Sequence, residues 1–333
     1  MPDASFLPYL LIILLAIGFA FVNGTNDTAN AIATVVGTRV LSPRKAIIMA
    51  AVANLVGVFT GTAVARTIGK GILGPESLTY ETVIAGLIAA VIWSVVATRK
   101  GLPVSLTHCL VAGLAMAGVA MAGFGSVDWG ILLKIIAAVG IAPIMGMAGG
   151  YLLMVALLWI FRRSVPSKTN GLFSHLQIFS AAFMAFSHGR SDGQMPMGII
   201  ALGTVLYTGN AGLWDAIPLW IIVLSALSIS AGTAIGGWRV IQTVGVRMTN
   251  LRPINGFAAE TAAATVIQIA ASIGIPVSST HAISSAIMGV GATRRLSAVR
   301  WGVAGNIVGA WLLTFPICGA LGFLVAGLFK LIF

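Results

Sequence analysis

Long apolar runs constrain this 333-residue chain more than any other feature of its sequence. Four runs approach or exceed the roughly 20 residues that an α-helix needs to cross a bilayer; they cover 6–22, 46–65, 131–161 and 301–329. Only 8% of the residues are charged, against about 25% in soluble globular proteins. The short alternating segments of a membrane β-barrel do not fit either. The chain is therefore predicted to be a multi-pass α-helical protein of the cell (inner) membrane.

Polar side chains interrupt this apolar background twice, each time at helical spacing. The first stripe is Asn23, Asn26, Asp27 and Asn30, and the second is His188, Ser191, Asp192 and Gln194. Further on, the hexapeptide Pro-Val-Ser-x-Thr-His occurs at 103–108 and again at 276–281. Polar groups inside hydrocarbon cost free energy unless they bind something. The duplicated set therefore predicts one central site built from two halves.

The charges of the loops reverse between the two halves. A basic loop, 38–45, follows the first stripe, whereas the matching loop 208–215 has no Lys or Arg. The loop after the first hexapeptide holds Asp128, and the one after the second, 293–300, holds three arginines. Because basic loops favour the cytoplasm, the halves are predicted to be inverted, with the N-terminus outside. This rule also explains the net charge of +11 better than nucleic-acid binding does. The predicted halves are 1–165 and 166–333, which together form one transmembrane unit.

The same charge pattern predicts three full crossings and one helical hairpin in each half. The hairpins are expected at 82–123 and about 255–291, and a glycine precedes the proline of each hexapeptide by two residues. The segments 6–37 and 131–161 are long enough to be single tilted helices or broken ones. The expected fold class is an all-α polytopic membrane protein, with two inverted-topology repeats and hairpins or broken helices at the centre. Gly-x-x-x-Gly motifs that begin at Gly57, Gly146 and Gly305 predict close helix packing.

The first stripe has the chemistry of a cation site. Its positions step by three, one and three residues, which places all four side chains on one helical face. Amide and carboxylate oxygens suit a small hard cation such as sodium, which would offset the cost of about 3 kcal/mol for a charged Asp in mid-bilayer. Interhelical hydrogen bonding explains one Asn, but four polar groups less readily. Glu260, inside an apolar hairpin arm, is a further candidate. The predicted coupling-cation ligands are Asn23, Asn26, Asp27, Asn30, Ser191, Asp192, Gln194 and Glu260, with sodium expected at Asp27, Asn30 and Asp192.

The hexapeptides have the chemistry of an anion site. A proline in the first turn of a helix loses no hydrogen bond, and the N–H groups of 104–106 and 277–279 would then be free at the positive end of a helix dipole. Two inverted copies can bring two such ends to one tetrahedral anion. The alternative is that the hydroxyl groups only cap a broken helix. The predicted phosphate ligands are Ser105, Leu106, Thr107, Ser278, Ser279 and Thr280, together with Asn26, Asp27 and Asp192.

An intramembrane Ser–His hydrolase is a remote alternative. Ser105 and His108 are one helical turn apart, so a dyad is conceivable. Such a dyad would occur twice, without a Gly-x-Ser-x-Gly context. Because duplication is natural for binding and unusual for nucleophilic catalysis, no enzyme activity is expected.

These motifs resemble those of the inorganic phosphate transporter (PiT) family. Residues 24–31 read Gly-Thr-Asn-Asp-Thr-Ala-Asn-Ala, which is similar to the family signature Gly-x-Asn-Asp-x-x-Asn-Ala, and 186–189 and 256–260 resemble its second-half pattern. The resemblance implies secondary active symport of inorganic phosphate with sodium or protons, by alternating access, in a homodimer. It also implies that the Asn-Asp segments bind cation and phosphate, while the hexapeptide helix ends hold the anion.

The second signature departs from the family pattern. Ser191 stands where the family usually has Asn, which removes one amide ligand, and Pro196 stands where many relatives carry a polar or basic residue. Proton coupling, and transport of sulfate or another tetrahedral oxyanion, therefore stay open. No cofactor is expected other than the coupling ion.

Overall fold

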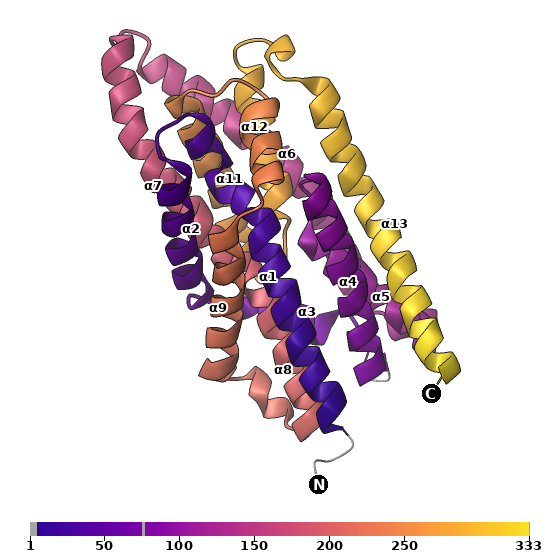
Figure 1. The fold of residues 1–333 in the computed structure, drawn as a ribbon. Helices are drawn as coiled ribbons and strands as arrows, with labels where there is room; N and C mark the ends of the chain where they lie inside the picture. The colour runs from indigo at the N-terminus through magenta and orange to yellow at the C-terminus, as the bar shows by residue number, and fades with distance from the viewer. Residues whose placement is uncertain (1–4, 75–76, 333) are drawn as a thin grey trace.

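A computed structural model describes residues 5–74 and 77–332 of the chain. Within these ranges the chain folds into helices joined by short loops, and α1 begins at the end of the molecule where α13 finishes (Figure 1). The α-helices are α1 (Phe6–Gly37), α2 (Pro43–Val58), α3 (Ala63–Gly71), α4 (Tyr80–Lys100), α5 (Leu106–Ala122), α6 (Trp129–Ile160), α7 (Pro166–Asp192), α8 (Gln194–Thr208), α9 (Leu219–Ile235), α10 (Trp238–Gln242), α11 (Pro253–Ser272), α12 (Ser279–Ala292) and α13 (Trp301–Ile332). Short 3₁₀ helices are η2 (Phe124–Ser126), η3 (Ala211–Trp214) and η5 (Leu296–Ala298), and the π-helical turn η4 (Thr243–Arg247) follows α10. The predicted all-α fold is confirmed.

Several of these helices have the length and apolar character of membrane spans. Within the described residues, α1, α4, α6 and α13 qualify alone, whereas α2 with α3 and α9 with 238–247 qualify as pairs bent by 69° and 63°. The two segments that could have been broken are continuous, because α1 and α6 each have 32 residues. At 1.5 Å per residue each is about 48 Å long, which exceeds a hydrocarbon core of about 30 Å. Both helices therefore tilt or project beyond the bilayer.

Two helical hairpins enter from opposite ends and meet inside the molecule. Hairpin 1 consists of α4 and α5, and hairpin 2 of α11 and α12; hairpin 2 lies above hairpin 1 in Figure 1. Their tips are in contact. Thr107 Oγ1 donates to Val277 O (3.4 Å), and Thr280 Oγ1 donates to Val104 O (3.1 Å). The two hexapeptides thus lie side by side, as a single central site requires.

A bent span from the other part of the chain holds the tip of each hairpin. The tip glycines, Gly101 and Gly274, both have a φ of 72°, which favours glycine. Gly101 O accepts a hydrogen bond from Thr243 Oγ1 (3.0 Å), and Gly274 O accepts one from Thr67 Oγ1 (2.7 Å). Thr243 follows the bend between α9 and α10, and Thr67 follows the bend between α2 and α3. The bent span in 1–165 therefore holds the tip of hairpin 2, and the bent span in 166–333 holds the tip of hairpin 1.

Glycines bring α1 and α9 into backbone contact beside the polar stripe. A Cβ atom added to Gly24 of α1 would lie 2.0 Å from Ile229 O, and one added to Gly232 of α9 would lie 2.0 Å from Phe21 O. No side chain fits at either position. The crossing of these two helices consequently depends on both glycines.

The Gly-x-x-x-Gly motifs differ in what they pack against. A Cβ atom on Gly146 of α6 would lie 2.4 Å from Ala282 O of α12, and one on Gly57 would lie 2.2 Å from the backbone of α7. Close packing is confirmed at these two motifs. At the third motif, Gly305 is exposed and Gly309 half-buried, and a Cβ atom on either would meet nothing within 4 Å, so this motif makes no close helix contact within the described part of the chain.

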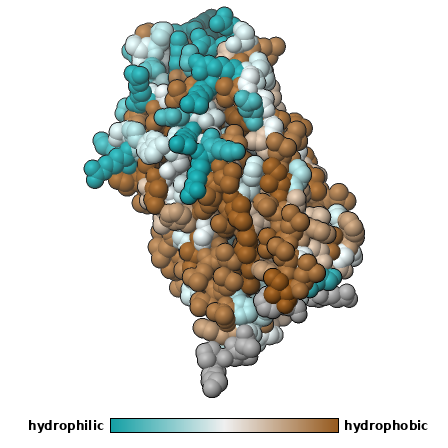
Figure 2. All heavy atoms as spheres, turned by 45° about the vertical axis from the view of Figure 1, so that its right-hand side comes forward, coloured by the Kyte–Doolittle hydropathy of each residue, from teal (hydrophilic) through white to brown (hydrophobic). Residues whose placement is uncertain are grey.

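Figure 2 shows that apolar atoms cover most of the visible face, while polar atoms gather at its upper end. The loop between α1 and α2 and the loop between α12 and α13 lie at that end in Figure 1. These are the loops rich in Arg and Lys. Since basic loops favour the cytoplasm, the prediction from the sequence assigns the upper end to the cytoplasm. The start of α1 then faces outward, in line with the sequence.

Candidate functional site

The first polar stripe forms one buried face of α1. Asn23, Asn26, Asp27 and Asn30 are each at most 1% exposed. The spacing of the stripe turns this face toward the tips of both hairpins and toward the end of α7. The predicted face is therefore present, and the groups that surround it decide its chemistry.

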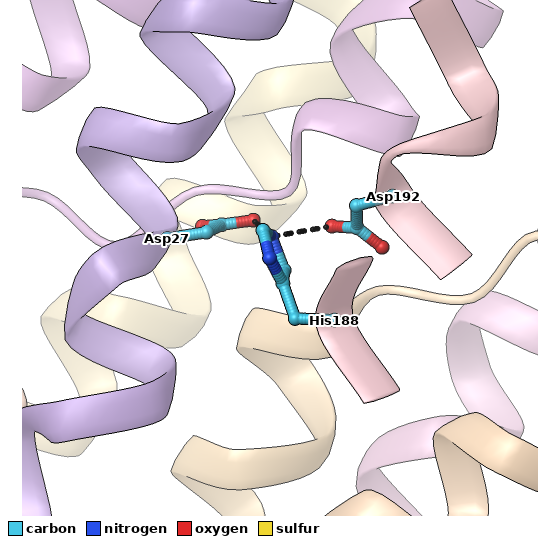
Figure 3. A group of neighbouring side chains, drawn as sticks. All are labelled: Asp27, His188 and Asp192. Atoms are coloured by element: carbon cyan, nitrogen blue, oxygen red, sulfur yellow. Dashed lines mark ion pairs between the residues drawn. The ribbon is translucent and has the colours of Figure 1, made fainter. Parts of the chain in front are cut away.

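Asp27, His188 and Asp192 form the centre of the site (Figure 3). His188 Nε2 lies 3.5 Å from Asp27 Oδ2 and 3.3 Å from Asp192 Oδ2. The same nitrogen faces Asn23 Oδ1 at 3.3 Å, and the other ring nitrogen, Nδ1, faces Asn54 Oδ1 at 3.2 Å. One imidazole therefore links two buried carboxylates, one from each half of the chain.

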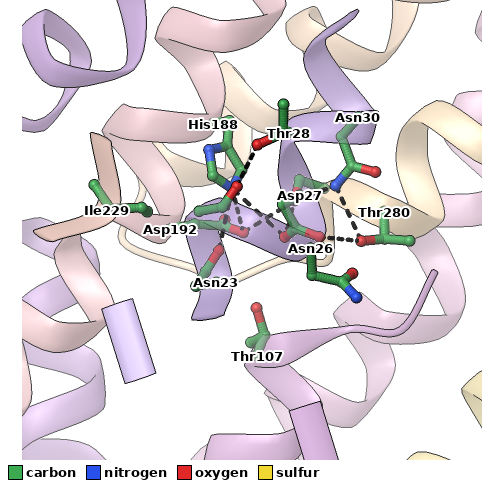
Figure 4. A network of polar contacts seen from close by, with 12 residues as sticks. Asn23, Asn26, Asp27, Thr28, Asn30, Thr107, His188, Asp192, Ile229 and Thr280 are labelled. Atoms are coloured by element: carbon green, nitrogen blue, oxygen red, sulfur yellow. Dashed lines mark hydrogen bonds and ion pairs between the residues drawn. The ribbon is translucent and has the colours of Figure 1, made fainter. Parts of the chain in front are cut away.

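Hairpin 2 approaches this centre with two hydroxyl groups (Figure 4). Ser279 Oγ is 2.9 Å from Asp192 Oδ2 and 3.3 Å from Asp27 Oδ2. Thr280 Oγ1 is 3.0 Å from Asp27 Oδ1, and Asn30 Nδ2 donates to both hydroxyl oxygens, at 3.3 and 3.0 Å. The first turn of α12 thus contacts both aspartates.

Hairpin 1 approaches from the other side. Asn26 Nδ2 donates to Thr98 Oγ1 at the end of α4 (2.8 Å) and to Leu102 O in the tip (3.4 Å). Thr107, in the first turn of α5, lies beneath Asn26 and Asp27 in Figure 4. Leu106 begins α5. All the elements predicted to build the site therefore meet here.

The serines of the two hexapeptides are helix caps, which corrects the expected start of both helices. Ser105 Oγ accepts from the N–H of His108 (3.3 Å), and Ser278 Oγ accepts from the N–H of His281 (3.2 Å). The helices therefore begin at 106 and 279, and the prolines lie before the caps rather than in the first turn. A serine in the extended conformation satisfies the N–H of the third helical residue, which proline cannot do.

The same geometry speaks against a hydrolase. The ring of His108 packs edge to face on His281, with centroids 4.7 Å apart, and on Phe315. Ser105 and Ser278 each accept a hydrogen bond from a main-chain N–H group. Each serine hydroxyl thus caps a helix, and the histidine ring packs against other rings.

The site offers acceptor oxygens that have no donor. Asn26 Oδ1, Asn30 Oδ1 and Asp192 Oδ1 are buried without a hydrogen-bond partner. Buried polar atoms are nearly always paired, and carboxylate and amide oxygens are ligands for hard cations. The space beside Asp27 and His188 is too small for a water molecule.

Gln194, a predicted ligand, lies outside this cluster. Gln194 Oε1 accepts from the N–H groups of Val64 (2.8 Å) and Ala65 (3.2 Å), so its side chain closes the first turn of α3. Ser191 is buried on the same turn as Asp192. Gln194 is not brought to the central carboxylates, because the N–H groups of a distant helix orient it.

Glu260 forms a second polar cluster. It accepts hydrogen bonds from the hydroxyl groups of Thr34 and Ser180 and from Gln177 Nε2 (3.5 Å). Thr34 lies seven residues beyond Asp27 on α1, which is about 10 Å along the helix toward the cytoplasmic end. Glu260 itself is fully buried. Glu260 thus belongs to a separate polar cluster and not to the central site.

Three members of the central site were not among the predicted ligands. His188 belongs to the second stripe and lies one turn before Asp192, so its spacing could have identified it. Asn54 orients His188 and donates to Thr233 Oγ1 (2.8 Å), and Thr98 holds Asn26. No pattern in the neighbouring sequence identifies Asn54 or Thr98, because the partners of both residues are far away in the sequence.

Comparison with known proteins identifies what this arrangement is similar to. Residues 23–322 match the profile of the phosphate transporter family. A probable low-affinity inorganic phosphate transporter of Rhizobium meliloti is 42% identical, over 94% of this chain and 95% of its own. One of Bacillus subtilis is 40% identical, over 97% and 98%. A solved structure described as the sodium-dependent phosphate transporter superposes with a TM-score of 0.90 at 28% identity, over 98% of this chain and all of that one.

Proposed function

The chain belongs to the phosphate transporter family, and from that premise we propose that Asp27 and Asp192 bind the coupling cations beside the transported phosphate. The protein is a multi-pass membrane protein, of the inner membrane in a bacterium, that carries inorganic phosphate by symport; it is not an enzyme. One observation carries the proposal. The two buried aspartates share both His188 and Ser279 as partners.

Electrostatics gives the reason for coupling. Phosphate is an anion, and a buried site that already holds two carboxylates repels it, because burying like charges together is costly. His188 is the only basic side chain that contacts Asp27 and Asp192 in the described part of the chain. Cations bound by the unpaired oxygens of Asn26, Asn30 and Asp192 would remove the repulsion. Phosphate would then enter only together with them.

The hydroxyl groups of hairpin 2 would link cation binding to phosphate binding, because they can donate either to the carboxylates or to phosphate. Ser279 and Thr280 donate to Asp27 and Asp192 in the structure described here. When cations take the carboxylate oxygens, these hydroxyl groups are free to turn toward phosphate, as is Thr107 of hairpin 1. The main-chain N–H groups at the starts of α5 and α12, at Leu106 and Ser279, add the positive ends of two helix dipoles. Ser105 and Ser278 would hold these helix starts in place.

Alternating access would use the two hairpins in turn. Hairpin 1 and hairpin 2 come from opposite ends of the molecule, which we assign to the external and the cytoplasmic side from the loop charges. Displacement of either hairpin would therefore open the centre to one side only. We propose that 1–165 and 166–333 are the two inverted halves that move relative to each other. The substrate stays beside α1 and α7 while access to it changes.

Sodium is the coupling ion that we expect. The unpaired ligands are oxygen atoms, and the solved relative is described as sodium-dependent. In proteoliposomes, an inward sodium gradient should drive uptake of labelled phosphate above equilibrium, and excess arsenate should compete better than excess sulfate. Uptake driven by a proton gradient alone would assign proton coupling. Uptake indifferent to both gradients would contradict symport, and stronger competition by sulfate would change the assigned substrate.

Glu260 is expected to bind the coupling cation at a second site, on the cytoplasmic side of the central site. The change Glu260→Gln keeps the shape, removes the charge and replaces one of the two acceptor oxygens with an N–H donor, from which the Ser180 hydroxyl can accept. We expect the sodium concentration for half-maximal uptake to rise about tenfold, because one charge-assisted contact contributes about 1.5–3 kcal/mol. The half-maximal phosphate concentration at saturating sodium should stay within about twofold.

Ser180→Ala, which removes one hydroxyl partner of Glu260, is the matched variant for this test. A smaller shift of the same kind is expected from it. An unchanged sodium dependence of Glu260→Gln, with the protein correctly folded, would reduce Glu260 to a packing role.

The homodimer implied by the family resemblance remains a prediction for this chain. Its mass should be measured in detergent by light scattering coupled to size-exclusion chromatography, with the contribution of the detergent subtracted. A mass of one protomer at all protein concentrations would exclude a stable dimer. The site described above lies within a single chain, so transport does not depend on that outcome.

A further inference from the structure

A polar pocket at the cytoplasmic end lies apart from the central site. Its volume is about 570 Å³, and its lining includes Thr249, Asn250 and Ser297 together with Arg294, Arg295 and Arg300. No acidic residue lines it, and no carboxylate of the described residues forms an ion pair with these arginines. Three guanidinium groups without a counter-charge in a concave site favour an anionic ligand.

The pocket joins the two ends of hairpin 2. Thr249, which precedes α11, donates through Oγ1 to Ala298 O (3.0 Å), beyond the end of α12. The N–H of Arg300 donates to Met248 O (3.0 Å), which ties the start of α13 to the same place. A ligand in the pocket would therefore touch the chain where it enters hairpin 2 and where it leaves.

An apolar groove begins at the residue that follows Arg300. Its volume is also about 570 Å³, and its walls include Ile144, Met147, Met288, Trp301, Val308 and Leu312. It extends along α13 as far as Phe315 and ends against His108 and His281. The helical segment from Trp301 to Phe315 rises about 21 Å, whereas one leaflet of hydrocarbon is about 15 Å thick, half of the core. The groove is thus long enough for one acyl chain.

We propose that one anionic phospholipid of the cytoplasmic leaflet occupies both places, with its phosphate on the arginines and an acyl chain in the groove. The adjacency of Arg300 and Trp301 favours one amphiphile over two ligands, because a headgroup and its chain are joined at this depth. Anionic lipids are abundant in the cytoplasmic leaflet, and a tryptophan at the mouth of the groove is typical of the membrane interface. A soluble anion would use only the pocket, and a second copy of the protein would cover only the groove. This lipid site does not depend on the proposed cation ligands.

The headgroup half of the proposal is tested by native mass spectrometry of purified protein. The protein is incubated with phosphatidylglycerol or phosphatidylcholine of identical chains, and the retained lipid is counted. The wild type should retain phosphatidylglycerol at least about tenfold better, since each nearby cation contributes about 1 kcal/mol. Arg294→Gln with Arg295→Gln should abolish the preference. Arg162→Gln with Arg163→Gln, a pair at the same end outside the pocket, should keep it.

The chain half is tested by filling the groove. Gly140 lines it, and a side chain there would meet no atom within 4 Å, so Gly140→Phe should reduce retention of both lipids. Gly327→Phe, which also has open space around it and does not line the groove, is the control. Phosphate uptake shows that each variant is folded.

Three results would overturn the proposal. Equal retention of the two lipids by the wild type would remove the headgroup site. Unchanged retention of both lipids by Gly140→Phe would remove the acyl chain from the groove and leave only a pocket for an anion. Lipid-free dimers whose formation Gly140→Phe prevents would assign the groove to a second copy of the protein.

Discussion

Replacing both central carboxylates, by Asp27→Asn and Asp192→Asn together, should lower the initial rate of phosphate uptake at least about 100-fold. Each carboxylate is expected to hold a cation and to orient a hydroxyl group of hairpin 2. Charge-assisted contacts contribute about 1.5–3 kcal/mol each, and two of them amount to a factor of 100 or more. Asparagine has nearly the same shape, so the fold should survive. The measurement is sodium-driven uptake of labelled phosphate into proteoliposomes.

The control is Asp128→Asn. Asp128 is exposed and caps α6 by accepting from the N–H of Ile131, and asparagine is an equally good cap. Uptake should stay within about twofold of the wild type. Gradient-driven uptake above a tenth of the normal rate in the double variant would remove both aspartates from the coupling mechanism. The single variants should each be severely impaired, because both carboxylates contact His188 and Ser279.

The second large effect concerns packing rather than charge. Gly232→Val should prevent α1 and α9 from crossing as they do, because even a Cβ atom there would lie 2.0 Å from Phe21 O. The helices would have to separate, and α1 would carry Asp27 away from the hairpin tips. Overpacking of this kind costs about 3 kcal/mol or more, which corresponds to a fall of roughly 4 °C or more in the melting temperature of a chain of this length.

Gly305→Val is the matched control for this change. Gly305 also lies inside a long apolar helix, but a Cβ atom there meets nothing within 4 Å. Its melting temperature in detergent should stay within about 2 °C of the wild type, the effect of a surface substitution. A stable Gly232→Val variant with normal uptake would mean that the two helices do not cross as described.

Much of the architecture could be predicted because the membrane restricts what a chain can do. Apolar runs located several of the spans, and repeated motifs located the two hairpins. The buried face of α1 followed from helical spacing alone, since Asn23 to Asn30 lie within two turns. The meeting of the two hexapeptides followed from the expectation of one shared site.

The remaining parts depend on contacts between residues far apart in the sequence. Gln194 has the polarity of a ligand, but Val64 and Ala65, 130 and 129 residues away, determine where it points. In the sequence, Asn54 is a single asparagine in an apolar segment, and only the packing of α7 shows that His188 is its partner. The helix starts were predicted at the prolines because a serine cap can be recognised only once the backbone bends there. Such partners cannot be read from a local pattern.

The hydroxyl contacts at the hairpin tips have a consequence for how such a protein could arise. Thr67 donates a hydrogen bond to Gly274 O, and Thr243 donates one to Gly101 O. Each of the two parts, 1–165 and 166–333, therefore holds the hairpin tip of the other. A protein of half this length could not close its own hairpin. If the halves 1–165 and 166–333 are inverted copies, as we propose, an ancestor of half this length would have had to insert into the membrane in both orientations and pair with a copy of itself.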